Sequence, residues 1–189
     1  MKKLSPDFIR HAAVFAVALF LDQVTKIWAR GRFSLPGGEP DYSDSMRVIG
    51  DWLQFRLVYN HGAAFGMKPH ALLPFLHPMF FYVAFSLVAI ALLSFYYRKL
   101  GREEGAARLG ISLILSGAVG NNLIDRLFMH KVTDFIDAGI PGYAPRWPVF
   151  NIADSAVSIG LILLVFAPMF ARKTPVAPSA PSDAASDAR

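Results

Sequence analysis

The nine residues VFNIADSAV, at positions 149–157, place the carboxyl group of Asp154 at the start of a long apolar segment. No charged residue follows Asp154 until Arg172. A helix needs about 20 mostly apolar residues to cross the hydrocarbon core of a bilayer, and this segment is nearly that long. The stretch therefore predicts a membrane-spanning helix with an acidic residue at its N-terminal end. An ionisable residue at the edge of a membrane span is energetically costly and usually functional.

The composition of the whole chain also indicates an integral membrane protein. Of its 189 residues, 54% are hydrophobic and 17% are charged, and the mean hydropathy is +0.39. Soluble domains carry about 25% charged residues. The chain has no cysteine, which excludes a disulfide framework, a zinc–thiolate site and a cysteine nucleophile. The basic residues behind the net charge of +5 flank the apolar runs, so we expect no nucleic-acid partner.

Four segments are apolar enough and long enough to span a bilayer. They cover residues 11–28, 78–97, 109–128 and 152–170. The first is followed by no A-x-A-like cleavage site, so we interpret it as a retained anchor. We expect one membrane-embedded, mainly α-helical domain over residues 1–171. A disordered tail rich in Pro, Ala and Ser should follow over residues 172–189.

The Lys and Arg residues near the ends of the spans predict the orientation of the chain. Three groups of them precede the first span, separate the second from the third and follow the fourth, so these groups fall on one side of a four-span protein. These residues are Lys2, Lys3, Arg10, Arg98, Lys99, Arg102, Arg108, Arg172 and Lys173. The opposite side also carries basic residues, namely Arg30, Arg32, Arg47, Arg56 and Lys68. We expect the side of the three groups, with both termini, to be the cytoplasm. The segments 29–77 and 129–151 would then lie outside.

The outer segment 29–77 contains one clear strand pattern. In WLQFRLVY, residues 52–59, Leu53, Phe55, Leu57 and Tyr59 alternate with other residues, as in a half-buried strand. Glycines interrupt the pattern on both sides. We therefore expect a small β element at the outer surface of the membrane.

Acidic residues gather at the span ends that share this outer side. They are Asp22, Asp125, Asp134 and Asp154. Several of them also have a purely structural interpretation. Asp22 and Lys26 are spaced to pair on one helix face, and Asp125 can hold Arg126 or a neighbouring backbone group. Asn151 and Asp154 are spaced for a capping box at the start of the last span.

Two of these acids can also perform peptide hydrolysis. A pair of carboxyl groups that share one proton can activate water and polarise a carbonyl without a metal or a nucleophilic side chain. An acid that begins the last span can meet Asp134, which lies in the segment before it. Asp137 is expected in an exposed loop.

Other candidate chemistries find little support in the sequence. The five histidines form no H-E-x-x-H arrangement, so we expect no metal site, with His70 and His77 at the membrane interface. Ser116 and Ser155 do not lie in G-x-S-x-G.

Five motifs in order closely resemble those of the bacterial lipoprotein signal peptidases, signal peptidase II. They are DQVTK (22–26), NHGAAFG (60–66), NNLIDR (121–126), VTDFID (132–137) and FNIADSA (150–156). The resemblance implies a four-helix membrane bundle with an outward β-cradle and an amphipathic periplasmic arm. It also implies an aspartic endopeptidase of the bacterial inner membrane, with its active site at the periplasmic face and no cofactor. Its partners would be membrane lipids and diacylglyceryl-modified prolipoproteins, cut immediately before the modified cysteine.

Carried over motif by motif, the resemblance implies that Asp134 and Asp154 are the catalytic pair. The supporting residues would be Asp22, Lys26, Asn60, Asn122, Asp125, Arg126 and Asn151. Among them, Asp22 and Lys26 would brace the first span beside the pair. Asn60 would hold the substrate backbone or order the cradle.

One motif departs from the usual pattern of the family. The family reads G-G-A-x-G-N, two residues and then D-R, whereas this chain reads SGAVGNNLIDR. It has either an extra asparagine or a glycine replaced by Asn121. Counting forward from Gly117 selects Asn121, and counting back from Asp125 selects Asn122. We favour Asn122.

Two other functions are compatible with acids at membrane spans. A small proton-coupled transporter or channel component also needs acidic residues within the membrane, but those residues are usually spaced one after another across the bilayer. A purely structural membrane subunit would leave the cluster of acids unexplained. The clustering at one face favours the peptidase.

Overall fold

The computed structural model describes residues 5–62 and 78–170. Its helices are α1 (Pro6–Phe33), α2 (Pro78–Lys99), α3 (Gly105–Ala118), the π-helical segment η3 (Val119–Met129) and α4 (Ile152–Phe170). Its strands are β1 (Met46–Ile49), β2 (Leu53–Asn60) and β3 (Val132–Ala138). Three earlier expectations lie outside the described residues: residues 63–66 of the NHGAAFG motif, the histidines His70 and His77, and the disordered tail.

Four helical segments in the described part of the chain are long and apolar enough to cross a membrane, as predicted. The helix α1 is longer than its predicted span at both ends, because charged residues continue the helix beyond the apolar core. It begins at Pro6, and Ser5 caps it by accepting a hydrogen bond from the backbone N of Phe8 at 3.2 Å. The mainly α-helical membrane architecture is thus confirmed.

The third span changes its helical geometry at Val119. From Val119 to Met129 the chain is a π-helix, with hydrogen bonds five residues apart in place of four. His130, with a φ of 60°, ends it in a left-handed conformation. Side chains in this segment therefore point in directions that an α-helical spacing does not predict.

The helices α3 and α4 pack with their backbones in contact. A Cβ atom built on Gly110 would lie 2.6 Å from the carbonyl oxygen of Gly160, and one built on Gly117 would lie 2.5 Å from that of Ala153. Small residues at such positions allow membrane helices to approach closely. This contact continues up to the start of α4, where Asp154 lies.

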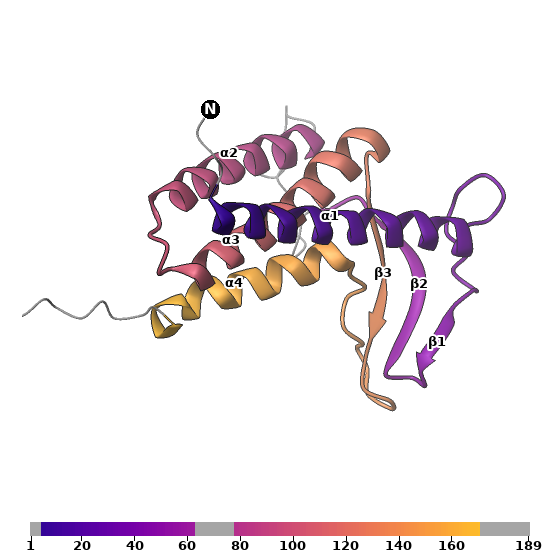
Figure 1. The fold of residues 1–189 in the computed structure, drawn as a ribbon. Coiled ribbons are helices and arrows are strands. Elements are labelled where there is room, and N and C mark those ends of the chain that lie inside the picture. The colour runs from indigo at the N-terminus through magenta and orange to yellow at the C-terminus, as the bar shows by residue number, and fades with distance from the viewer. Residues whose placement is uncertain (1–4, 63–77, 171–189) are drawn as a thin grey trace, which may run out of the picture.

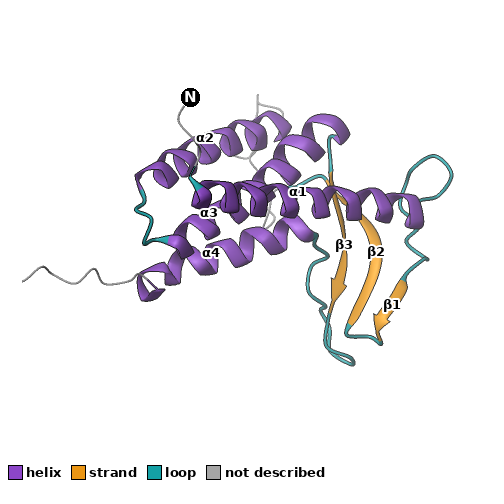
Figure 2. Ribbon diagram, viewed as in Figure 1, coloured by secondary structure: helices purple, strands orange, loops and turns teal. Residues whose placement is uncertain are grey.

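The three strands form an antiparallel sheet in the order β1–β2–β3 at one end of the helical bundle (Figure 2). The predicted strand is β2, and β3 is a further strand in the segment 129–151. Phe33, Leu57 and Phe135 are buried where the sheet packs on the C-terminal part of α1. Trp28 makes edge contacts with the rings of Phe33 and Phe55, each at 5.6 Å between centroids.

The sheet lies at the end of the bundle where α1 ends and α4 begins (Figure 1). The start of α1, the connection between α2 and α3, and the end of α4 lie together at the opposite end. This arrangement agrees with the predicted topology of four spans. It brings the C-terminal part of α1, η3, β3 and the start of α4 close to one another.

Candidate active site

The start of α4 is fixed by acidic and amide side chains. The backbone N of Asp154 donates to Asn151 Oδ1 at 2.9 Å, and the backbone N of Asn151 donates to Asp154 Oδ2 at 3.1 Å. This is the predicted capping box. Asp22 of α1 adds a third bond, because its Oδ1 accepts from the backbone N of Ala153 at 2.9 Å. The cap uses only Oδ2 of Asp154, so the other carboxylate oxygen is available for a second role.

Asn151 links Asp154 to Asp134 of β3. Its Nδ2 donates to Asp134 Oδ1 at 2.7 Å, while its backbone N holds Asp154. Asp134 is only 3% exposed and lies opposite Val58 in the register of β2 and β3. The structure therefore brings the two predicted catalytic acids together around one asparagine.

Asp134 is buried beside a second acid, and both conditions disfavour its ionised form. Burial first, and then the nearby carboxylate of Asp154, raise the pKa of Asp134 to about 7. Hydrogen bonds from Asn60 and Asn151 and the charge of Lys26 act in the opposite direction, lowering the pKa of Asp134. A carboxyl group of this kind can hold a proton near neutral pH, which a general acid requires.

The raised pKa of Asp134 predicts that the protein loses stability as the pH rises. Unfolding returns the carboxyl to its ordinary pKa of 3.8, so between 3.8 and about 7 the folded state binds more protons than the unfolded state. The free energy of unfolding should fall across that window by up to ~4 kcal/mol. Thermal unfolding of Asp134→Asn in detergent, measured from pH 4 to pH 8, should show a smaller fall than the wild type.

A suitable control is Asp51→Asn, because the Asp51 side chain is 53% exposed. It should retain the pH dependence of the wild type. If Asp134→Asn also retained it, the buried carboxyl would not be protonated in the folded protein.

A buried cation lies behind the two acids. Lys26 Nζ donates to Asp22 Oδ2 at 2.8 Å, Asp125 Oδ2 at 3.0 Å and Asn121 Oδ1 at 2.6 Å. All three donor positions of the ammonium group are used, and its side chain is fully buried. The predicted pairing of Asp22 with Lys26 is confirmed. Asp125 also accepts from the backbone N of Thr133 at 3.0 Å, so it joins η3 to β3 from behind the acids.

Asn121, and not Asn122, contacts Asp154. Asn121 Nδ2 donates to Asp154 Oδ1 at 2.8 Å, whereas Asn122 Oδ1 accepts from Arg126 Nε at 3.1 Å. The structure therefore places Asn121, and not the favoured Asn122, beside Asp154. The preference for Asn122 rests on the eight-residue step from Arg126 to Asp134, whereas the π-helical segment η3 places the first of the two asparagines at the site. The only signal in the sequence was the additional residue in this motif.

Arg126 connects the site to α2 and to the end of β2. Its guanidinium lies 4.3 Å from the centre of the Tyr82 ring and donates to the carbonyl oxygen of Gly62. The backbone N of Gly62 donates in turn to Asn60 Oδ1 at 2.9 Å. This orients the Asn60 side chain, whose amide group bonds to Asp134. The predicted supporting residues Asn60 and Arg126 thus lie on the Asp134 side of the site.

The expectation that Asp137 is exposed is wrong. Its side chain is buried in β3 and accepts from Arg56 Nε and Arg146 Nε, both at 2.7 Å. Arg146 also donates to the backbone oxygen of Asp51 at 2.7 Å, so the loop after β3 folds back over the sheet. Asp137 is consequently a structural residue, and Asp137→Asn would weaken a buried ion pair.

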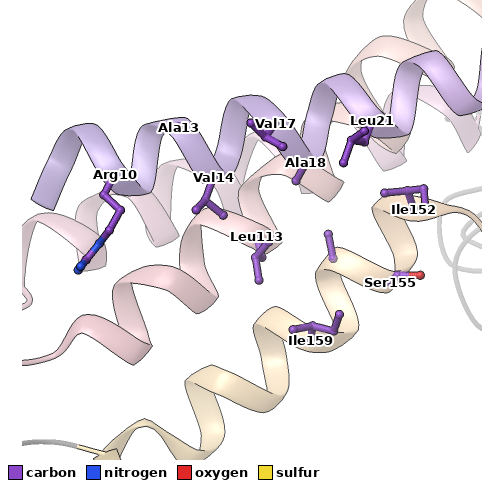
Figure 3. A pocket seen from close by; sticks show the side chains of 11 residues that line it. Arg10, Ala13, Val14, Val17, Ala18, Leu21, Leu113, Ile152, Ser155 and Ile159 are labelled. Atoms are coloured by element: carbon purple, nitrogen blue, oxygen red, sulfur yellow. The ribbon is translucent and has the colours of Figure 1, made fainter.

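An apolar groove of about 530 Å³ lies between α1, α3 and α4 (Figure 3). Its α4 wall is formed by Ile152, Ser155, Ala156 and Ile159, which share one helix face. Since a helix turns about 100° per residue, Asp154 lies on the opposite face. The groove is therefore separate from the two acids. In residues 5–62 and 78–170 no group of three potential metal ligands was found.

Comparison with known proteins places these features in one family. The model of the family described as signal peptidase (SPase) II matches residues 14–170. The lipoprotein signal peptidase of Geobacter metallireducens is 36% identical over 161 residues, which cover 85% of this chain and 91% of that protein. That of Caulobacter vibrioides is 39% identical over 153 residues, covering 81% and 82%. A bacterial membrane enzyme solved by the in meso method has a similar fold, with a TM-score of 0.69, 31% identity and coverage of 85% and 87%.

Proposed function

This chain belongs to the signal peptidase II family of aspartic proteases, and from that premise we propose that Asp134 and Asp154 are its catalytic pair. We further propose that its substrates are diacylglyceryl-modified prolipoproteins, cut immediately before the modified cysteine. The observation that carries the proposal is the bridge of Asn151 between the two acids at the start of a membrane span. No metal or nucleophilic side chain enters this chemistry.

The reaction needs one ionised and one protonated carboxyl group. The ionised aspartate takes a proton from water, and the water oxygen attacks the scissile carbonyl carbon. The carbonyl oxygen receives the proton of the other aspartate, which gives a neutral tetrahedral intermediate. When the C–N bond breaks, the first aspartate protonates the leaving nitrogen. The second recovers its proton from a hydroxyl of the intermediate, and the pair returns to its initial state.

The lipid on the substrate contributes by anchoring the scissile bond at the depth of the two acids. Asp154 begins a membrane span and Asp134 lies in the sheet that adjoins it, so the pair lies where the spans meet the outer interface. A diacylglyceryl group that stays in the bilayer holds its cysteine at the same depth. Each buried methylene contributes ~0.8 kcal/mol to such anchoring.

The test is the initial rate of cleavage of a lipidated prolipoprotein by the purified protein in a defined bilayer. The matched substrate has the same peptide sequence without the diacylglyceryl group. We expect the lipidated form to be cut far faster, with the new N-terminus at the modified cysteine. Equal rates would indicate a general intramembrane aspartic peptidase, and no cleavage of either form would contradict the proposed function.

We also propose that the sheet and the two acids face the periplasm and that both termini are cytoplasmic. The ends of α2 and α4 and the start of α1 lie together, and the Lys and Arg groups of the sequence flank these ends. Reporter fusions at Gly101 and after residue 189 should both indicate the cytoplasm. An external signal from either fusion would contradict this orientation.

The acids do not form a path across the membrane, which disfavours a proton-coupled transporter. Asp22, Asp125, Asp134 and Asp154 are tied into one network at the end of the bundle beside the sheet. Proton paths need successive groups along the bilayer normal. The geometry fits hydrolysis at one interface.

A further inference from the structure

The orientation of the Asn121 amide is set by the buried cation. Lys26 Nζ has only donors, so the atom of Asn121 that lies 2.6 Å from it must be the oxygen. The NH₂ group of Asn121 therefore faces Asp154 Oδ1 at 2.8 Å. A reversed amide would place donors against donors at Lys26.

Asp154 receives hydrogen bonds on both carboxylate oxygens from groups that cannot accept a proton in return. One donor is the Asn121 amide, and the other is the backbone N of Asn151 at 3.1 Å. Hydrogen bonds donated to both oxygens favour the ionised form of a carboxyl group. The positive charge of Lys26 also favours the ionised form of Asp154, from which it is separated only by the side-chain amide of Asn121.

Asp134 is in a different position relative to the cation. It also accepts from an amide, the Nδ2 of Asn151, and among the described residues its link to Lys26 runs through two side chains, those of Asn151 and Asn121. Burial and the neighbouring acid are the two largest influences on the pKa of Asp134, and Lys26 is the smallest. In the described part of the chain, the charged groups around the pair include Asp22 and Arg30 of α1 and Asp125 and Arg126 of η3.

We propose that Asn121 is a positioning residue that relays the charge of Lys26 to Asp154 and keeps Asp154 as the ionised member of the pair. Asp154 then takes the proton from water, and Asp134 holds the proton that polarises the scissile carbonyl. This assignment rests on the proposed function. It also gives a role to the π-helical turn, which places Asn121 between the cation and the acid.

The two limbs of the pH–rate profile distinguish the roles of the two acids. Activity falls on the acid side when the base becomes protonated, and on the alkaline side when the acid loses its proton. Asn121→Leu removes the relay, so the acid limb of kcat/KM should move to higher pH by about one unit. The alkaline limb should stay in place. Asp51→Asn changes an exposed acid outside the site, and it should move neither limb.

Two outcomes would overturn the assignment. A shift of the alkaline limb alone in Asn121→Leu would give Asp154 the proton and reverse the roles. If neither limb of the pH–rate profile moved in Asn121→Leu, Asn121 would not carry the electrostatic effect of Lys26 to the two acids.

Infrared difference spectra of the resting protein test the same assignment without substrate. At mildly acidic pH the absorption of the protonated carboxyl group should disappear in Asp134→Asn and persist in Asp154→Asn. The opposite pattern would overturn the assignment. Since this measurement needs no turnover, it can succeed even if the wild type fails to cut a prolipoprotein, so the two proposals fail independently.

Discussion

Asp154→Asn and Asp134→Asn should each reduce cleavage of a lipidated prolipoprotein by about 10³- to 10⁴-fold. An amide cannot take a proton from water or share one with a second acid, so either change removes the proton transfer that the reaction needs. Initial rates of both variants, measured with the wild type in the same bilayer, provide the test. The double variant should be no worse than either single variant, because the two acids act as one unit.

Both variants should remain folded. The side-chain oxygen of an asparagine at position 154 can still accept from the backbone N of Asn151, so the capping box survives. At position 134 the amide oxygen can still accept from Asn151 Nδ2. Asp51→Asn changes an exposed acid on the same side of the protein and should leave the rate unchanged. Turnover at the wild-type rate by either variant would exclude the acid pair.

Lys26→Met should cause the largest loss of stability among single substitutions in the site, ~3–5 kcal/mol. Removal of the ammonium group leaves the carboxylates of Asp22 and Asp125 buried beside each other without a cation. Asp22 also caps α4 and Asp125 holds β3, so the effect extends to both elements. The thermal unfolding midpoint in detergent micelles at neutral pH measures the loss.

A compensated variant separates lost charge balance from lost packing. Lys26→Met combined with Asp22→Asn and Asp125→Asn removes the unpaired charges and should recover part of the stability. Arg47→Met provides the control, because Arg47 pairs with Asp51 at the surface and such pairs contribute ~0–1 kcal/mol. If Lys26→Met were as mild as Arg47→Met, the buried network would not stabilise the fold.

Features that depend on neighbouring residues could be predicted from the sequence. The four spans follow from hydropathy, and the strand β2 follows from its alternation. The capping box of Asn151 and Asp154 requires only a spacing of three residues. The pairing of Asp22 with Lys26 requires only a spacing of one helical turn.

Two features could not be predicted because they depend on geometry beyond the local pattern. The position of Asn121 follows from the π-helical turn, which one additional residue in the motif indicates only ambiguously. The burial of Asp137 depends on Arg56, which is 81 residues away in the chain, and on Arg146, which the loop after β3 brings back. Neither partner is visible from the sequence around Asp137.

The backbone contact between α3 and α4 has a consequence for how a peptide enters. Helices that touch at Gly110 with Gly160 and at Gly117 with Ala153 cannot slide past each other without a steric clash, so we expect them to move as one rigid body. Any opening of the bundle must then come from α1 or α2. Because Asn121 continues the chain of α3 and Asp154 begins α4, their hydrogen bond keeps its register while the rest of the bundle moves. The bundle can thus change shape without disturbing the contact between Asn121 and Asp154.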